Sequence, residues 1–209
     1  MKILSYDLET KMSITRNFLN EMREKLGKRK KSFIFIGKDE KSMKYTICYG
    51  DILNLDESID AIVNSANPFM SRGGGVCGLI HKAGGYEFTE FCIKQGGLKV
   101  GECKVTPGFD LPYKHVIHVL SPRYDRTEKP KEDLICAYHN VCACAEKNGF
   151  NRIAFPLLSG DHHGYPQELA LECVKEAFES YYTERLEVFL VIKTKQYING
   201  EKDEKAGNN

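Results

Sequence analysis

The sequence has almost no net charge. Thirty Lys and Arg residues stand against 29 Asp and Glu residues among 209 positions, which gives a formal charge of +1. Because no broad basic field results, we do not expect nucleic acid as a partner. The basic run at 28–31 is interpreted as the solvated end of a helix.

Long hydrophobic runs are also missing. The strongest apolar run covers only residues 188–192, which is far too short to cross a bilayer, so no membrane partner is expected. Asp7, Glu9 and Lys11 interrupt the first residues and argue against the apolar core of a signal peptide. We therefore expect a cytoplasmic location, with secretion by an unrecognised route as the alternative.

Cysteine pairs of the CxxC type are absent. The eight cysteines are scattered along the chain, which argues against a zinc ribbon or a thioredoxin-type site. Most of them are expected to be small buried hydrophobic residues. We predict no metal site, no cofactor and a monomeric chain.

No internal repeat or low-complexity linker divides the chain, and its length fits one domain. Residues 1–42 are predicted to form an accessory layer, with a strand at 33–36 and a helix over 14–26 between Ser13 and Gly27. The main domain is predicted over 43–198, and the polar residues 199–209 are predicted to be a disordered tail.

Strands and helices alternate in the main domain. Strands are predicted at 43–49, 59–63, 103–106, 115–120, 152–155 and 186–192, and helices at 76–83, 87–95, 131–148 and 167–182. This alternation predicts an α/β fold, with a largely parallel or mixed sheet covered on both faces. Ligands of such sheets bind outside the carboxyl ends of the strands, which places function in the loops 64–75 and 156–166.

The first loop ends in three consecutive glycines, Gly73, Gly74 and Gly75, directly before a predicted helix. Glycines let the backbone approach a ligand and adopt positive φ, and the exposed N–H groups of a helix start attract anions. A diphosphate is the natural occupant, although the spacing is neither a P-loop nor GxGxxG. A flexible turn is the alternative interpretation.

The neighbours of these glycines carry a specific resemblance. The segments at 64–67 (NSAN), 73–76 (GGGV) and 78–84 (GLIHKAG) resemble the signature of macrodomains, and so do Gly50-Asp51-Ile52 and the segments at 106–109 and 116–118. The resemblance covers 45–192 and does not explain the residues before it. It implies a three-layer α/β/α fold with a mixed central sheet that binds ADP-ribose. Some members of that family hydrolyse ADP-ribose from proteins or process its derivatives.

The resemblance also implies the ligand contacts. Asp51 would accept a hydrogen bond from the adenine amino group beside the Ile52 backbone, and Asn67 would contact the distal ribose. A local backbone-capping role is the alternative for Asn67, and Asn64 fits that role better. The remaining residues expected to bind ligand are Asn64, Ala66, Gly73, Gly74, Gly75, Val76, Cys77, Ser159, Gly160, Gly164 and Tyr197.

The second loop departs from the family pattern. Asp161, His162 and His163 stand where the family has a glycine, an aliphatic residue and an aromatic residue. Because an ionised Asp161 would repel a diphosphate, either its carboxylate turns toward the distal ribose or the diphosphate pose differs. The three residues suit an acid–base set, and the alternatives are a solvated polar loop or a zinc site that includes Cys77.

Cys77 marks a second departure. Many hydrolytic macrodomains carry an Asp ten residues after the second Asn, and this chain has Cys77 there. A neutral thiol is a poor base, while a helix N-terminus could lower its pKa and yield a thiolate; we favour a packing role. Asp161 is then the predicted base, with Asn67 positioning the water and His162 or His163 assisting.

Two functional hypotheses follow from these residues. The first is an ADP-ribosylhydrolase that cleaves a mono-ADP-ribose linkage, glycosidic or ester, on a protein or a small-molecule adduct. The second is a non-catalytic reader of ADP-ribose or a related signalling nucleotide. The expected partner is ADP-ribose or an ADP-ribosylated protein. Alignment places Lys193, with Tyr197 nearby, where the family often stacks an aromatic residue on adenine.

Overall fold

The computed structural model describes residues 33–36, 43–55, 58–160 and 163–192. Several predictions fall outside these ranges: the helix over 14–26, the tail, and the site residues Asp161, His162 and Tyr197. Within the described ranges the chain forms a seven-stranded sheet and three α-helices.

The strands lie close to where the sequence predicts them. They are β1 (Phe33–Ile36), β2 (Lys44–Tyr49), β3 (Ala61–Ser65), β4 (Cys103–Pro107), β5 (His115–Val119), β6 (Arg152–Pro156) and β7 (Glu187–Ile192). Their order across the sheet is β1-β2-β7-β6-β3-β5-β4. The five inner strands are parallel, and the edge strands β1 and β4 pair antiparallel with their neighbours, so the central sheet is mixed as predicted.

The helices are α2 (Gly75–Lys94), α3 (Pro130–Lys147) and α4 (Gln167–Ser180), with a 3-10 turn at Tyr124–Arg126. α3 begins with Pro130 in its first turn, and Gly149 (φ 75°) follows its end, as the Pro-before and Gly-after pattern predicts. The two helices predicted over 76–95 are joined as α2. A break at Gly85 (φ 84°, ψ −176°) divides it where the sequence places a stop.

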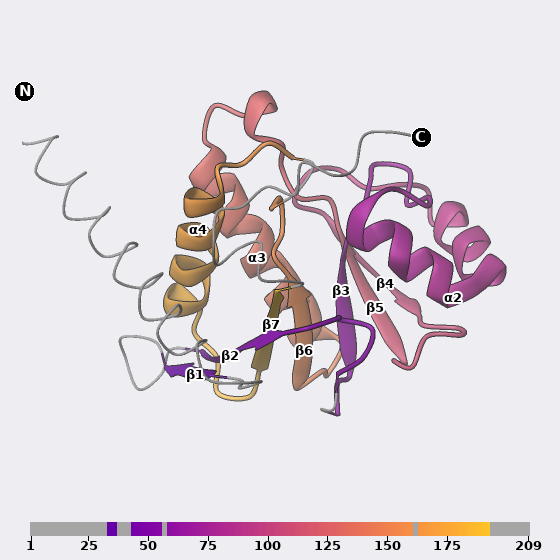
Figure 1. The fold of residues 1–209 in the computed structure, drawn as a ribbon, viewed down its shortest axis with the longest axis horizontal. Coiled ribbons are helices and arrows are strands. Elements are labelled where there is room, and N and C mark those ends of the chain that lie inside the picture. Colours follow the sequence, from indigo (N-terminus) through magenta and orange to yellow (C-terminus); the bar gives the residue numbers. More distant parts are fainter. Residues whose placement is uncertain (1–32, 37–42, 56–57, 161–162, 193–209) are drawn as a thin grey trace, which may run out of the picture.

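The helices cover both faces of the sheet, as Figure 1 shows: α3 and α4 lie on one face and α2 on the other. Neighbouring residues of β3 point to opposite faces, so Ile62 joins the core under α2 and Val63 the core under α3 and α4. Burial on both faces explains why these strands are nearly continuous apolar runs. The predicted three-layer α/β/α fold is confirmed.

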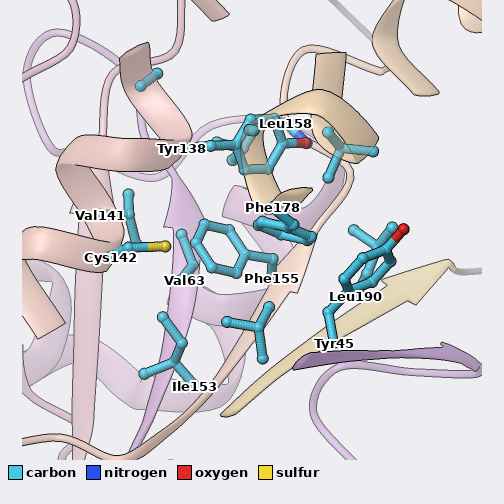
Figure 2. Packing of buried hydrophobic residues seen from close by; sticks show 14 of the residues in the cluster. Tyr45, Val63, Tyr138, Val141, Cys142, Ile153, Phe155, Leu158, Phe178 and Leu190 are labelled. Carbon is cyan, nitrogen blue, oxygen red and sulfur yellow. The ribbon is translucent and has the colours of Figure 1, made fainter. Parts of the chain in front are cut away.

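The larger core anchors the second loop. Tyr138 of α3, Phe155 of β6 and Phe178 of α4 are fully buried and pack with ring centroids 5.4–5.5 Å apart (Figure 2). The Tyr138 hydroxyl accepts a hydrogen bond from the backbone N–H of Leu158 at 2.9 Å, just beyond β6. The start of the second loop is therefore tied to the rigid interior.

Sheet order brings the functional loops together. β3 lies between β6 and β5, and all three are parallel, so their carboxyl ends meet at one edge of the sheet. The loops that follow these three strands are consequently neighbours in space. This is the position at which open α/β sheets bind ligands.

Candidate functional site

A cavity of about 230 Å³ opens between the first and second loops at this edge of the sheet. It is lined by Ser65, Ala66, Asn67, Gly73, Gly74, Gly75, Val76, Cys77, Pro156, Leu157, Ser159, Gly160 and His163. Both predicted loops therefore contribute to one cavity. Its described lining contains no Lys or Arg, so an anion there would be held by backbone N–H groups and the helix dipole.

The glycine turn forms the start of α2. Gly74 is the N-cap residue and, as a glycine, has no side chain that could cap the helix, and no acidic residue occupies the first turn. The first N–H groups of α2 are thus available to an anion, and the helix dipole favours one. Of the three glycines only Gly75 has positive φ, at 53°, so the expectation of a left-handed turn holds for one position.

Asn67 is held by its own loop. Its Oδ1 accepts hydrogen bonds from the N–H of Phe69 at 3.0 Å and of Ser71 at 3.3 Å, and its Nδ2 donates to the Ser71 carbonyl at 2.7 Å. The side chain therefore has the local capping role weighed as an alternative, and it also lines the cavity. A Cβ on Gly73 would lie 3.3 Å from Asn67 Nδ2, so the glycine keeps this amide accessible.

Ser159 shapes the described part of the second loop. It adopts positive φ of 58°, and Gly164 follows with φ of 74°. The Ser159 hydroxyl donates to the Pro122 carbonyl at 2.8 Å, which ties the loop to the segment after β5. Ser159 and Gly160 line the cavity as the resemblance implies, whereas Asp161 and His162 lie outside the described residues.

The Nδ1 atom of His163 faces three oxygen atoms. Its Nδ1 lies 3.1 Å from the Pro122 carbonyl oxygen, 3.1 Å from Ser121 Oγ and 3.4 Å from Ser159 Oγ. A carbonyl can only accept a hydrogen bond, so the contact with Pro122 favours the tautomer that carries the proton on Nδ1. Nε2 is then the ring nitrogen that can take up a proton. A histidine arranged in this way suits acid–base chemistry at the cavity wall.

The sequence analysis missed the serines behind His163. Ser121 Oγ lies 3.1 Å from Ser65 Oγ, so hydrogen-bonded side chains connect the end of β3 to His163. Ser65 also lines the cavity. The available signal was position: Ser121 follows β5 by two residues, at the edge of the sheet where ligands bind.

Cys77 is a buried neutral thiol at the base of the glycine turn. Burial raises the pKa of this thiol, and hydrogen bonds from Gly73, Asn64 and Asn67 only partly offset that effect. The raised pKa argues against a thiolate at this helix N-terminus. The packing role expected for this residue agrees with its 6% exposure.

The structure separates two residues that the sequence placed together. Ala66 lines the cavity, and its N–H donates to the Val119 carbonyl at 2.9 Å. Asn64 is fully buried, and its Nδ2 lies 3.1 Å from His118 Nδ1. Asn64 therefore lies beneath the cavity and outside the described lining, so its contact with a ligand stays a prediction.

Asp51 and Ile52 lie apart from this cavity. Asp51 is exposed and its Oδ1 accepts a hydrogen bond from the N–H of Leu53 at 3.0 Å, which fixes a tight turn after β2. Ile52 is buried. Neither residue belongs to the described cavity lining, so contact with the adenine end of a ligand remains a prediction.

The described residues contain neither a candidate metal cluster nor a membrane-spanning helix. No group of three or more His, Cys, Asp or Glu side chains is placed there to hold a metal ion. Nor does any helix in these ranges combine the length and apolar character required to span a bilayer.

The buried histidine under the site predicts acid sensitivity. Burial, with a smaller effect of the nearby His81, lowers the pKa of His118 to about 3. The unfolded chain, with a histidine pKa of about 6.5, then binds the extra proton, so stability is present above that pH and lost as the pH falls. We predict that the free energy of unfolding decreases by up to about 1.4 kcal/mol per pH unit below about pH 6 from this group.

Urea unfolding at neutral pH and at about pH 5 measures this effect. The variant His118→Gln should lose this part of the pH dependence, whereas His115→Gln, on the same strand but only half-buried, should keep it. Equal pH dependence in wild type and His118→Gln would show that His118 is not a buried neutral group.

The comparisons with known proteins identify the class to which this fold and cavity belong. The family model for the Macro domain matches residues 63–174. The chain belongs to the macro domain family, which confirms the resemblance carried by the loop motifs.

Relatives and solved structures agree with this assignment. The chain is 38% identical to an O-acetyl-ADP-ribose deacetylase of Citrobacter rodentium over 66% of its own length and 80% of the relative. It is 41% identical to the ADP-ribose glycohydrolase MACROD2 of Xenopus laevis, covering 64% of this chain but only 33% of that protein. A structure of the Oceanobacillus iheyensis macrodomain with ADP matches at a TM-score of 0.68 and 27% identity, over 82% of this chain and 93% of that one.

Proposed function

We propose that the cavity between the two loops binds ADP-ribose. The cavity itself carries this proposal, because it combines a helix start, an amide and a second glycine-containing loop in one lining. The diphosphate would lie against the N–H groups of Gly74, Gly75 and Val76 and against Gly160. The distal ribose would lie beside Asn67, whose amide both donates and accepts hydrogen bonds. Related proteins named for ADP-ribose chemistry support this assignment.

The adenine would extend beyond this cavity. At about 230 Å³ the cavity is smaller than the range of about 300–1,000 Å³ usual for whole ligand pockets, so it suits the diphosphate and one ribose. Asp51, held in its turn, would accept the hydrogen bond from the adenine amino group beside Ile52. Tyr197 would complete the adenine side.

We further propose that the site hydrolyses a mono-ADP-ribose linkage on a protein or small-molecule adduct. Asp161 would act as the base that takes a proton from water, and Asn67 would position that water. The water oxygen forms the new bond to carbon as the linkage to the adduct breaks, and the departing group receives a proton. His163, in the tautomer that the Pro122 contact favours, would relay protons through Nε2, and His162 would assist.

The second candidate function is a reader without hydrolysis. The neutral, buried thiol of Cys77 favours it, because this position supplies no base at the edge of the glycine turn. Such a reader would bind ADP-ribose or a related signalling nucleotide and release it unchanged.

The state of the cysteines bears on the proposed location. All eight cysteines are free thiols, which favours a reducing compartment, so we propose a cytoplasmic location. We propose a monomer that acts on ADP-ribosylated protein, with no nucleic-acid partner. The division into an accessory layer before residue 43 and a macrodomain over 43–198 also remains a proposal. The edge strand β1 falls within that accessory layer.

Calorimetry with ADP-ribose, ADP and AMP tests the ligand assignment. We expect ADP-ribose to bind most tightly, because only it reaches both the diphosphate loops and Asn67. Binding of ADP-ribose no tighter than about millimolar would reject both candidate functions.

Release of ADP-ribose from modified proteins separates the enzyme from the reader. Defined Asp/Glu-, Ser- and Arg-linked substrates reveal which linkage is cleaved. We expect release by the wild type and its loss in Asp161→Ala, with Glu87→Ala on the outer side of α2 as the control. Release by Asp161→Ala at the wild-type rate would refute Asp161 as the base, and no release by wild type would favour the reader.

A further inference from the structure

A buried chain of polar side chains runs through the core beneath the first loop. Thr106 of β4, His118 of β5 and Asn64 of β3 are all at most 1% exposed. His118 Nε2 lies 2.9 Å from Thr106 Oγ1, and its Nδ1 lies 3.1 Å from Asn64 Nδ2. Three neighbouring strands therefore contribute one hydrogen-bonded row.

The direction of these hydrogen bonds is fixed by the Asn64 amide. Nδ2 can only donate, so His118 Nδ1 accepts and Nε2 carries the ring proton, which it donates to Thr106. The buried imidazole stays neutral, as this pattern requires. Thr106 and His118 thus hold the Asn64 amide in one orientation.

Cys77 connects the row of Thr106, His118 and Asn64 to the cavity. Asn64 Nδ2 lies 3.8 Å from Cys77 Sγ, and the thiol donates to the Ser71 carbonyl at 3.7 Å. The same carbonyl accepts the hydrogen bond from Asn67 Nδ2 at 2.7 Å. Cys77 and Asn67 therefore share one acceptor, and the row ends at the amide that faces the cavity.

Asn64 maintains this arrangement at a cost. Its Oδ1 is buried and, among the described residues, has no hydrogen-bond partner. An unsatisfied buried acceptor destabilises a fold, and an apolar residue of similar shape would avoid the penalty. What the amide supplies in return is two donated hydrogen bonds, one to His118 and one to Cys77.

We propose that Asn64 and Cys77 are positioning residues. The row from Thr106 to Cys77 fixes the Ser71 carbonyl and, through it, the amide of Asn67. The thiol is suited to this task because it accepts from Asn64 and donates to Ser71 at the same time. A carboxylate at this position could only accept, so it would break the contact with the carbonyl. The proposal rests on the ADP-ribose binding proposed above, because Asn67 is the group that is positioned.

Substitution of Cys77 tests the row. We expect Cys77→Ala to weaken ADP-ribose binding about three- to tenfold, the effect of one lost neutral hydrogen bond, and Cys77→Ser to recover most of the affinity. The matched control is Cys173→Ala, which removes another buried thiol that donates to a backbone carbonyl, at 3.9 Å to Lys131, on the opposite face of the sheet. Its affinity should equal that of wild type.

A second readout separates positioning from general loosening and needs no ligand. The side-chain amide resonances of Asn67, assigned through Asn67→Ala, should shift in Cys77→Ala and in Asn64→Leu but not in Cys173→Ala. Unchanged Asn67 resonances or unchanged affinity in folded Cys77→Ala would overturn the proposal, even if wild type binds ADP-ribose well. If wild type fails to bind, the proposed function falls, and the resonances alone decide whether the row positions Asn67.

Discussion

We expect the variant His163→Asn to hydrolyse ADP-ribose from a modified protein about 10²- to 10⁴-fold more slowly than wild type. Its affinity for free ADP-ribose should stay near the wild-type value. An asparagine amide nitrogen can donate to the Pro122 carbonyl as Nδ1 does now, at 3.1 Å. The amide has no group in place of Nε2 that accepts a proton. The substitution therefore keeps the anchor of the side chain and removes only its proton transfer.

Single-turnover release and calorimetry on the same preparation measure the two quantities. His139→Gln is the control, because His139 also contacts a backbone carbonyl: its Nε2, whose position a glutamine amide can occupy, lies 2.9 Å from the Ala177 oxygen between α3 and α4. The control should match wild type in both measurements. A wild-type release rate in His163→Asn would remove His163 from proton transfer, and a loss of affinity alone would make it a ligand-binding residue.

The variant Gly78→Ala is expected to impair the site from inside α2. An added Cβ would lie 2.3 Å from the backbone oxygen of Gly73, so the glycine turn or the helix start has to move. The Gly73 oxygen and the Gly78 Cα that would carry the new Cβ both belong to the main chain. Roughly 1 Å of backbone movement is therefore needed to restore a normal contact distance. A displacement of this size costs about 10²-fold in rate, and we expect ADP-ribose binding to weaken in parallel.

The control for this prediction is Gly149→Ala. Gly149 follows α3 with φ of 75°, and an added Cβ there meets nothing within 4 Å. That variant should lose about 1 kcal/mol of stability through backbone strain and bind ADP-ribose normally. Folded Gly78→Ala with wild-type affinity would show that the glycine turn does not hold the diphosphate.

Local sequence signals were sufficient for most of the fold. Apolar runs marked the strands, and Pro130 and Gly149 bracketed α3 within one or two residues. Gly85 marked the break in α2 although its two halves form one element. These features depend on backbone geometry within a few residues, so a single sequence records them. The alternation of strands and helices then supplied the α/β architecture and both loops of the cavity, and the family signature supplied the expected ligand.

The site needed contacts that local patterns do not contain. Asn64 lies 54 positions from His118, and their contact arises only from the parallel register of β3 and β5. The tautomer of His163 likewise depends on Pro122, 41 positions away. For Cys77 the sequence left both a thiolate and a packed thiol open. Burial decided between them, and burial is a property of the assembled core.

The absence of Lys and Arg from the described cavity lining has a consequence for selectivity. A cationic pocket attracts any anion over a distance of about one Debye length, including free phosphate and nucleic-acid backbones. A pocket built on fixed N–H groups acts only at hydrogen-bond range and rewards only phosphates that match their directions. Such a site would respond little to the large cellular excess of simple anions, and it would select its ligand by the geometry of two linked phosphates.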